Sequence, residues 1–276
     1  MGIDLKKFRL TFLASLLACC LLVQPARELH AEEKKPLVVG VLPYLSPITL
    51  LKRFEPLAEH LREELGQKVT LTTEPNFPRF KNETEMGKYD IVLTAPHFVP
   101  PALDSGHYQL QTTTVKPLSA VLITRSDSPI TNIAEFKNPV VATPPEKALI
   151  SIIGKQYFPG ENLQPSHYVA YNSHNAAYHA VLRNNADAAI ISINVYNRAI
   201  LDKKPLRIIS QSNDYPGVGF LTAKTLSQKM QDKIHSALLS LDETLVGKDF
   251  LQRTTYKGFR PASPALYAPF RKLLGN

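Results

Sequence analysis

Residues 171–191 read YNSHNAAYHAVLRNNADAAII, and this stretch decides the fold class of the chain. It predicts a polar loop, a short helix and a turn into a buried strand of small apolar residues at 188–191. Asn172 or Ser173 can cap the helix, because either side chain can accept a hydrogen bond from the free N–H groups. The apolar face of the helix comes from residues at helical spacing, Ala177, Ala180 and Val181. A helix start with exposed N–H groups and the positive end of a dipole suits an anionic ligand.

Strands and helices alternate along the rest of the chain. Apolar or alternating runs predict strands at 37–42, 68–73, 89–94, 108–113, 118–124, 140–143, 167–171, 206–209 and 217–222. Helical spacing predicts helices at 49–65, 132–136, 146–157, 226–241 and 263–274, with a further short helix after 95–97. Gly66 is a natural stop for the first of these helices, and Pro144 and Pro145 suit the start of the helix over 146–157. The predicted fold class is α/β, with an open sheet covered by helices on both faces.

Polar loops follow several of the predicted strands, at 44–46, 94–97, 143–147 and 173–175. In open α/β sheets, ligands bind outside the carboxyl ends of the strands. We therefore expect the ligand-binding side chains in these four loops.

Residues 1–31 have the order of a secretory signal peptide. Basic residues within 6–9 precede an apolar run at 10–23, and a polar segment ends at Ala31. The run is shorter than the ~20 apolar residues that a transmembrane helix needs. We expect cleavage after Ala31, with a weaker site after Ala26, and a mature protein in the periplasm.

Both cysteines of the chain, Cys19 and Cys20, lie in this first segment. A chain cut after Ala31 has no cysteine, which excludes disulfides, cysteine catalysis and thiolate metal sites. The alternative is a lipoprotein, because residues 16–19 read LLAC and resemble a lipoprotein box in which Cys19 would carry lipid. Leu17 is bulky for its place in that motif, and the apolar run continues past Cys19.

Composition and spacing weigh against several function classes. The formal net charge of +8 favours anionic partners, but it is not gathered into Lys/Arg runs, so we expect no nucleic-acid partner. His174 and His179 are five residues apart and do not share a helix face, so we do not expect them to bind a metal ion as a pair of ligands. Ser126, Ser128 and the histidines form no recognisable nucleophile motif, and no glycine-rich phosphate loop is present. We expect no catalytic residues and no cofactor.

Five short motifs occur in order along residues 37–274. They read VGVLPY at 39–44, YDIV at 89–92, AVLI at 120–123 followed by SDSPI at 126–130, SHN at 173–175 ending in ADAA at 186–189, and GFRP at 258–261. Taken together, they resemble the periplasmic phosphate/phosphite/phosphonate-binding family of ABC transporters.

The resemblance implies a two-lobed periplasmic binding protein fold of type II. Lobe one would comprise residues 32–120 and 221–276, and lobe two would comprise residues 121–220. Two chain crossings near Ala120 and Gly219 would form a hinge, about which the lobes close on the ligand. We expect a monomer that captures a small oxyanion such as phosphate, phosphite or a phosphonate and delivers it to a membrane permease.

Two departures from the family pattern bear on the ligand. Phosphonate-binding members carry a Ser-Thr-Ser run at a helix start in lobe two, and here that place reads TPPEK at 143–147. Its prolines lack N–H donors, and Glu146 would repel an anion. The acidic residues that hold the amine of aminoalkyl phosphonates correspond to Asn194 and Val218, which are uncharged. We therefore expect no binding of aminoethylphosphonate, whereas phosphate, phosphite and other small polar ligands stay open.

The strand-end loops and the resemblance together single out eight candidate ligand-binding residues: Tyr44, Thr94, His97, Thr143, Ser173, His174, Asn175 and Asn194. Three of them have an ordinary alternative. His174 could cap its helix or be solvated, Tyr44 could pack at the rim between lobes, and the loop at His97 could be a simple turn. Lys147 is expected to be a solvated residue on a helix face.

Three function classes compete. The leading class is a transport receptor that serves an ABC permease. The second is a sensory binding protein of the same fold that presents its ligand to a membrane sensor kinase. The third is an enzyme on the same scaffold, which lacks a visible catalytic constellation.

Overall fold

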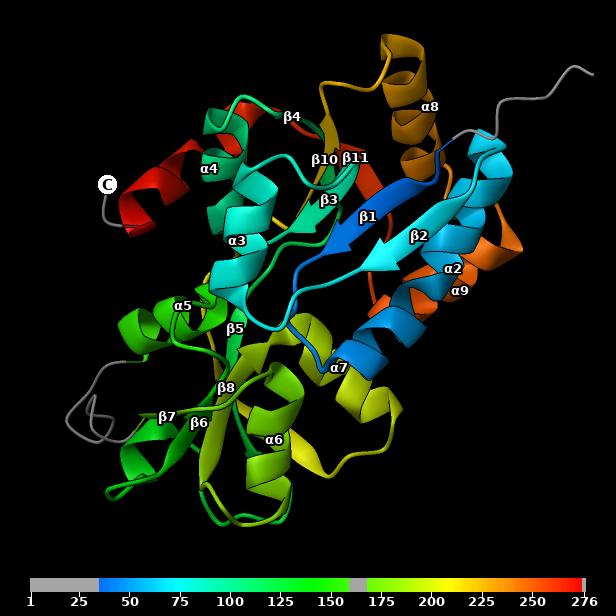
Figure 1. Ribbon diagram of the computed structural model, residues 1–276. Helices are drawn as coiled ribbons and strands as arrows, with labels where there is room; N and C mark the ends of the chain where they lie inside the picture. The colour runs from blue at the N-terminus through cyan, green and yellow to red at the C-terminus, as the bar shows by residue number, and fades with distance from the viewer. Residues whose placement is uncertain (1–34, 159–167, 275–276) are drawn as a thin grey trace, which may run out of the picture. The chain divides into compact units, whose positions relative to one another are not determined.

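The computed structural model describes residues 35–158 and 168–274 (Figure 1). The expected signal peptide at 1–31, its cleavage sites and Cys19 lie outside these residues, and so does His167. No helix within the described ranges combines the length and the apolar character that crossing a membrane requires.

The first sheet, here called sheet one, has the strand order β11-β4-β10-β3-β1-β2. Its strands are β1 (Leu37–Val41), β2 (Val69–Thr72), β3 (Ile91–Thr94), β4 (Tyr108–Thr114), β10 (Gly219–Ala223) and β11 (Phe259–Pro261). β1 pairs in parallel with β2 and β3, whereas β10 runs antiparallel to both β3 and β4. The carboxyl ends of β1 and β3 therefore lie at the same edge of the sheet.

The second sheet, sheet two, has the strand order β7-β6-β8-β5-β9. Its strands are β5 (Ala120–Arg125), β6 (Val141–Thr143), β7 (Tyr168–Ala170), β8 (Ala188–Ser192) and β9 (Leu206–Gln211). β6 pairs in parallel with β7 and β8, and β5 runs antiparallel to β8 and β9. Both sheets belong to one compact unit that starts at Pro36.

Helices cover both faces of each sheet, as the alternation of strand side chains requires. In β3, Ile91 and Leu93 pack into the core that contains α2, α8 and α9, while Val92 packs into the core that contains α3 and α4. In β5, Val121 and Leu122 likewise join opposite cores, on the sides of α6 and α5. The expectation of open α/β sheets with two covered faces is confirmed. The bounds are α2 Pro47–Leu65, α3 Phe77–Glu85, η1 Pro96–Phe98, α4 Val99–Asp104, η2 Ile133–Glu135, α5 Leu149–Tyr157, α6 His174–Leu182, α7 Ile193–Leu201, α8 Gln228–Leu239, α9 Leu245–Thr254 and η4 Pro264–Leu274.

Helix α2 carries a proline in its interior, Pro56, and packs against α9 (Figure 1). A proline has no N–H, so it leaves the carbonyl four residues earlier, that of Lys52, without its helical partner. The Nη1 atom of Arg253 on α9 donates a hydrogen bond to this carbonyl at 3.0 Å. The helix ends as the sequence predicts, at Gly66, which adopts the left-handed conformation with φ of 58°.

The sequence interpretation missed α3, α7, α9 and β11, and it placed the start of α5 too early. α5 begins at Leu149 rather than at Glu146, because a turn precedes it in which the N–H of Ala148 donates to the carbonyl of Pro145 at 2.8 Å. The two prolines are therefore part of a loop and not the first turn of the helix. The C-terminal segment is a 3₁₀ helix and not an α-helix, with Pro269 in its interior.

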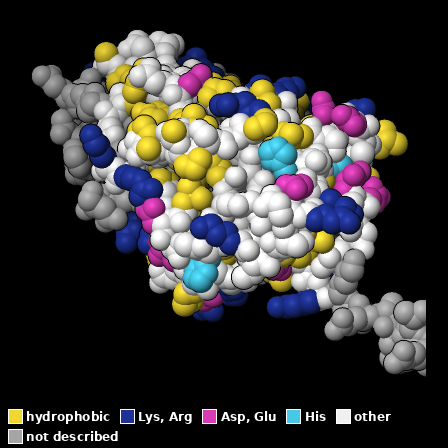
Figure 2. All heavy atoms as spheres, turned by 90° about the horizontal axis from the view of Figure 1, so that it is seen from above, with side chains coloured by type: hydrophobic (Ala, Val, Ile, Leu, Met, Phe, Trp, Pro, Cys, Tyr) yellow, Lys and Arg dark blue, Asp and Glu magenta, His cyan; other side chains and the backbone are white. Residues whose placement is uncertain are grey.

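Basic side chains are scattered over the face of the molecule seen in Figure 2. Lysine and arginine side chains alternate there with acidic and apolar ones and do not form a continuous patch. The net positive charge is therefore spread out on this face, in keeping with the lack of Lys/Arg runs in the sequence.

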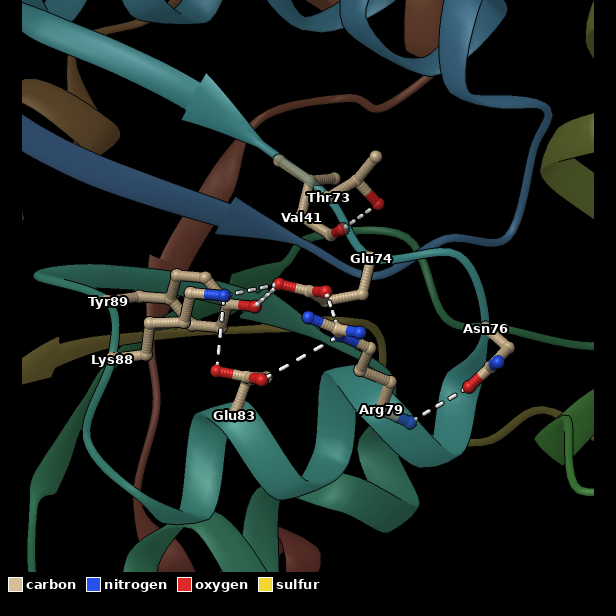
Figure 3. Close-up of polar contacts among 8 residues, drawn as sticks. All are labelled: Val41, Thr73, Glu74, Asn76, Arg79, Glu83, Lys88 and Tyr89. Atoms are coloured by element: carbon tan, nitrogen blue, oxygen red, sulfur yellow. Dashed lines mark hydrogen bonds and ion pairs between the residues drawn. The ribbon is translucent and has the colours of Figure 1, made fainter.

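Glu74 organises the connection between β2 and α3 (Figure 3). Its side chain is only 6% exposed, yet it lies 2.8 Å from both Lys88 Nζ and Arg79 Nε and accepts a 2.9 Å hydrogen bond from the hydroxyl of Tyr89. The hydrogen bond from Lys88 is the largest cause that lowers the pKa of this carboxyl, and the Tyr89 hydroxyl and the charge of Arg79 add to it, against the opposing effect of burial. The cluster thus ties Arg79 of α3 to Lys88 and Tyr89, which lie just before β3.

We expect Glu74→Gln to lower the free energy of unfolding by about 1–3 kcal/mol, the usual range for losing hydrogen bonds to a charged group. Because the pKa of Glu74 is lower in the folded chain than its ordinary 4.5, this stabilisation is present above pH 4.5 and disappears as the pH falls through the folded value. Urea unfolding of both proteins at pH 7 and in acid should show the difference shrinking in acid.

The matched control is Glu85→Gln at the end of α3, since Glu85 pairs with Lys81 of that helix at the surface. Exposed pairs contribute roughly 0.2–1 kcal/mol, so this variant should stay close to the parent. Equal losses for the two substitutions would show that burial of Glu74 has no special effect.

Candidate functional site

One cavity of about 60 Å³ is lined by residues that follow strands of both sheets. Tyr44 follows β1, Thr94 is the last residue of β3, and His97 lies just after it. His174 and Asn194 lie at the starts of α6 and α7. The expected position outside the carboxyl ends of parallel strands is therefore where the cavity lies. At roughly 10–15 Å³ for each water, it has room for a few waters or a small ion.

Five of the eight residues singled out in the sequence line this cavity: Tyr44, Thr94, His97, His174 and Asn194. The other three, Thr143, Ser173 and Asn175, are not among its lining residues. Ser173 instead caps α6, because its Oγ accepts a hydrogen bond from the N–H of Ala176 at 3.2 Å. The expected cap at Asn172 or Ser173 is thus confirmed at Ser173.

His97 is fully buried, and its ring has one satisfied and one unsatisfied nitrogen. Nε2 lies 3.1 Å from the carbonyl oxygen of Lys147, which can only accept, so Nε2 carries the proton. Nδ1 is therefore a bare acceptor, and it is buried without a hydrogen-bond partner. Burial lowers the pKa of His97 to about 4, although the hydrogen bond to the Lys147 carbonyl acts in the opposite direction.

In His174, the nitrogen that has a protein partner is Nδ1, whereas in His97 it is Nε2. The backbone N–H of Ser192 donates to Nδ1 at 3.2 Å, so Nδ1 is the acceptor and Nε2 carries the proton of the neutral ring. Burial lowers the pKa of His174 to about 3. The ring stands edge-on to that of Tyr44, with centroids 6.2 Å apart. The N–H of His174 also donates to the carbonyl of Tyr44 at 3.3 Å, which joins α6 to the loop after β1.

The hydroxyl of Tyr44 is part of a small polar group at the wall of the cavity. It shares hydrogen bonds with the hydroxyl of Tyr256 and with Arg53 of α2. Burial is the largest cause of the raised pKa of Tyr44 and of Tyr256. Both phenols are therefore neutral at physiological pH, and the charge of Arg53 acts on both of them.

The lining residues include no Lys, Arg, Asp or Glu, so the wall of the cavity is neutral. Most of it is apolar, and its polar atoms are few. Three of them, Thr94 Oγ1, His97 Nδ1 and Asn194 Oδ1, are buried without a partner. Buried polar groups are normally paired, so a ligand or a water that reached these atoms would satisfy them. In the described ranges, no three His, Cys, Asp or Glu side chains gather in a way that could hold a metal ion.

Sequence reasoning missed Ser192 and Tyr256 as lining residues. Ser192 had a readable signal, because it precedes the apolar, helix-forming run of α7 and caps that helix by accepting from the N–H of Val195. Tyr256 had none, since only the packing of the chain after α9 brings it to Tyr44.

The comparisons with known proteins agree with this fold. Residues 39–267 match the family described as the periplasmic substrate-binding protein of phosphonate ABC transporters. The phosphonates-binding periplasmic protein of Escherichia coli K12 is 25% identical over 280 residues, which cover 94% of this chain and 81% of that protein.

Solved structures show the same fold at lower identity. A binding protein component of an ABC phosphonate transporter from Pseudomonas aeruginosa has a TM-score of 0.75 and 19% identity, covering 87% of this chain and 86% of its own. PhnD1 from Prochlorococcus marinus, in complex with methylphosphonate, has a TM-score of 0.76 and 17% identity, covering 87% of this chain and 97% of its own.

Two sheets with a small cavity beyond their strand ends define a two-lobed, type II periplasmic substrate-binding protein. The chain belongs to the family of periplasmic substrate-binding proteins of phosphonate ABC transporters. The family resemblance and the fold expected from the sequence are thus confirmed. Membership in a transporter family favours the transport receptor over the sensory alternative, and the family is one of solute-binding proteins and not of enzymes.

We expect both cavity histidines to be neutral at pH 7 with the proton on Nε2, because burial lowers their pKa from 6.5 to about 4 and about 3. Nitrogen NMR of ring-labelled protein should show two Nε2–H rings that do not titrate above about pH 5. A titration midpoint near 6.5 for either ring would mean that it is exposed to solvent.

Proposed function

We propose that this protein captures a small phosphorus oxyanion, such as phosphite, phosphate or methylphosphonate, in the cavity at Tyr44, His97, His174 and Asn194, and delivers it to a membrane permease. The observation that carries the proposal is the set of buried atoms without partners, Thr94 Oγ1, His97 Nδ1 and Asn194 Oδ1, in a cavity that suits only a small ligand.

A neutral wall is compatible with an anionic ligand because N–H dipoles supply the attraction. His174 directs an Nε2–H donor from the start of α6, and Asn194 lies at the second residue of α7. Helix starts carry a partial positive charge and free N–H groups. Thr143, Ser173 and Asn175 lie away from the cavity lining, so we assign them supporting roles around the helix start and not direct contact.

The lining residues argue against an aminoalkyl phosphonate. An ammonium group buried in this cavity would need a carboxylate, and the wall has none. The uncharged Asn194 and Val218 both line the cavity, where a relative that binds an amine would need acids. We therefore restrict the ligand to small oxyanions without an amine.

We also propose the lobe boundaries at residues 32–120, 121–220 and 221–276, with a hinge near Ala120 and Gly219. Three hydrogen bonds support a closed arrangement, because each joins elements of the two sheets. They are His97 Nε2 to the Lys147 carbonyl, the His174 N–H to the Tyr44 carbonyl, and Thr255 Oγ1 to the Asn194 carbonyl. We propose that the protein acts as a monomer and binds no nucleic acid.

We expect Asn194→Ala to weaken binding of methylphosphonate about tenfold or more, since losing a hydrogen bond to an anion amounts to roughly 1.5–3 kcal/mol. Calorimetric titration measures this directly. Asn197→Ala, on the same helix but outside the cavity lining, is the matched control. Lys147→Ala should also bind normally, because His97 contacts its backbone carbonyl and not its side chain.

Phosphite, phosphate and methylphosphonate should each be tested, in calorimetry and by thermal shift. Absence of binding for all three would overturn the proposed function. If Asn194→Ala binds normally and Asn197→Ala or Lys147→Ala loses binding, the ligand binds at another site than this cavity.

We propose export by residues 1–31, with cleavage after Ala31. Mass spectrometry of the periplasmic fraction should then find a chain that begins at Glu32. A lipid-modified chain that begins at Cys19 would establish the lipoprotein alternative instead.

A further inference from the structure

The two buried histidines of the cavity have opposite hydrogen-bonding character. His174 offers a donor, because the N–H of Ser192 occupies its Nδ1 and leaves the proton on Nε2. His97 offers an acceptor, because the carbonyl of Lys147 occupies its protonated Nε2 and leaves Nδ1 bare. One ligand that pairs with both rings must therefore bring an acceptor and a donor.

A bare buried acceptor is unfavourable until a donor reaches it. His97 is completely buried, so bulk solvent cannot supply that donor. Asn194 Oδ1 adds a second buried acceptor in the same cavity. The cavity is thus built for a ligand that carries a hydrogen on oxygen or nitrogen, besides oxygens that accept.

The ionisation state of a phosphorus oxyacid decides whether it has an O–H group that can donate a hydrogen bond. The dianions of phosphite and methylphosphonate have only acceptor oxygens, whereas their singly charged forms keep one O–H group. The dianion of phosphate still keeps one O–H group, so phosphate does not distinguish the two cases. An ammonium group could also donate, but the neutral wall contains no carboxylate to compensate its charge. A sulfonate has the charge and shape of the singly charged phosphonate but has no O–H group.

We propose that the cavity selects the singly charged, protonated form of phosphite or of a phosphonate, whose O–H donates to His97 Nδ1 while an ionised oxygen accepts from His174 Nε2–H. This inference rests on the proposed function, and it names the protonation state of the ligand. Selection against the dianion follows because a second ionised oxygen at His97 would face the lone pair of Nδ1.

The titratable groups that line the cavity do not change charge over the relevant pH range. Burial lowers the pKa of His97 and His174 to about 4 and about 3, and burial raises the pKa of Tyr44 and Tyr256 above 10. The charge of Arg53 acts on Tyr44 and Tyr256, but Arg53 itself does not line the cavity. The side chains of Glu146 and Lys147, next to the carbonyl that His97 binds, line a separate groove. Between about pH 5 and 9, the ligand is thus the group whose ionisation changes.

The first test is calorimetric titration of the whole mature protein with methylphosphonate and with phosphite, from about pH 5.5 to 9. Above the second ionisation of each ligand, the affinity should fall about tenfold for each pH unit, and the midpoint should move with the ligand. Repeating the titration in buffers of different ionisation enthalpy should show uptake of about one proton at high pH. Affinity that is constant or rises with pH would overturn the proposal.

The second test compares methylphosphonate with methanesulfonate at pH 6. Both carry one negative charge and a methyl group, but only the phosphonate has an O–H group. We expect methanesulfonate to bind at least about tenfold more weakly. Equal affinity would show that the acceptor at His97 is not used and would overturn the proposal without any variant.

Two substitutions separate the nitrogens of His97. The amide nitrogen of His97→Gln falls near the position of Nε2, so it can keep the bond to the Lys147 carbonyl but removes the acceptor at Nδ1. The amide oxygen of His97→Asn falls near Nδ1 and keeps that acceptor. We expect His97→Gln to lose the preference for methylphosphonate over methanesulfonate and His97→Asn to retain it, with folding of both checked by thermal melting. Full discrimination by folded His97→Gln would overturn the proposal.

These outcomes separate the inference from the function on which it rests. Binding of an oxyanion with the opposite pH dependence, or of the sulfonate equally well, overturns only the protonation state. Absence of binding for phosphite, phosphate and methylphosphonate at every pH overturns the proposed function and the inference with it.

Discussion

Parallel pairing of β1 with β3 and of β6 with β8 is the constraint on which the site depends. Parallel strands end at a common edge, so the chain segments that leave those ends are brought together whatever their separation in the sequence. In this protein the segments that leave β1, β3 and β8 all contribute to the wall of one cavity. Tyr44, His97 and Asn194 meet there for that reason, although 150 residues separate the first from the last.

The cavity achieves its polarity without ionised side chains. A backbone atom orients each of its two histidines: the Lys147 carbonyl orients His97, and the Ser192 N–H orients His174. Burial keeps both rings neutral, so their donor and acceptor roles do not interchange at physiological pH. Specificity in such a site comes from the direction of hydrogen bonds, since an unpaired buried group penalises a ligand of the wrong kind.

The fold was largely predictable from the sequence because local signals agree with it. The apolar run of β1, the helical period of α2 with its stop at Gly66, and the cap of α6 at Ser173 are all present as expected. Helix α7 was missed because it follows β8 with no loop between them, and its cap, Ser192, is also the last residue of that strand. Helix α3 was missed because it is mostly polar and buries few side chains, Phe77, Phe80 and Thr84.

The site was predictable only in part. Tyr44, Thr94, His97, His174 and Asn194 follow strands or begin helices, so their gathering was foreseeable. Thr143 also ends a strand, but the loop after β6 and the start of α5 present Ala148, Leu149 and Ile150 to the cavity in its place. The tautomers of the two histidines depend on backbone atoms of distant residues, Lys147 and Ser192, and no local pattern encodes them.

The contact between Pro56, the Lys52 carbonyl and Arg253 has an evolutionary consequence. The carbonyl is free only because Pro56 lacks an N–H, so the value of Arg253 depends on that proline. In a relative with a non-proline residue at the position of Pro56, the carbonyl would be bonded within its own helix and the arginine would lose its target. The two positions therefore form an epistatic pair, in which exchange of one residue relaxes the selective constraint on the other.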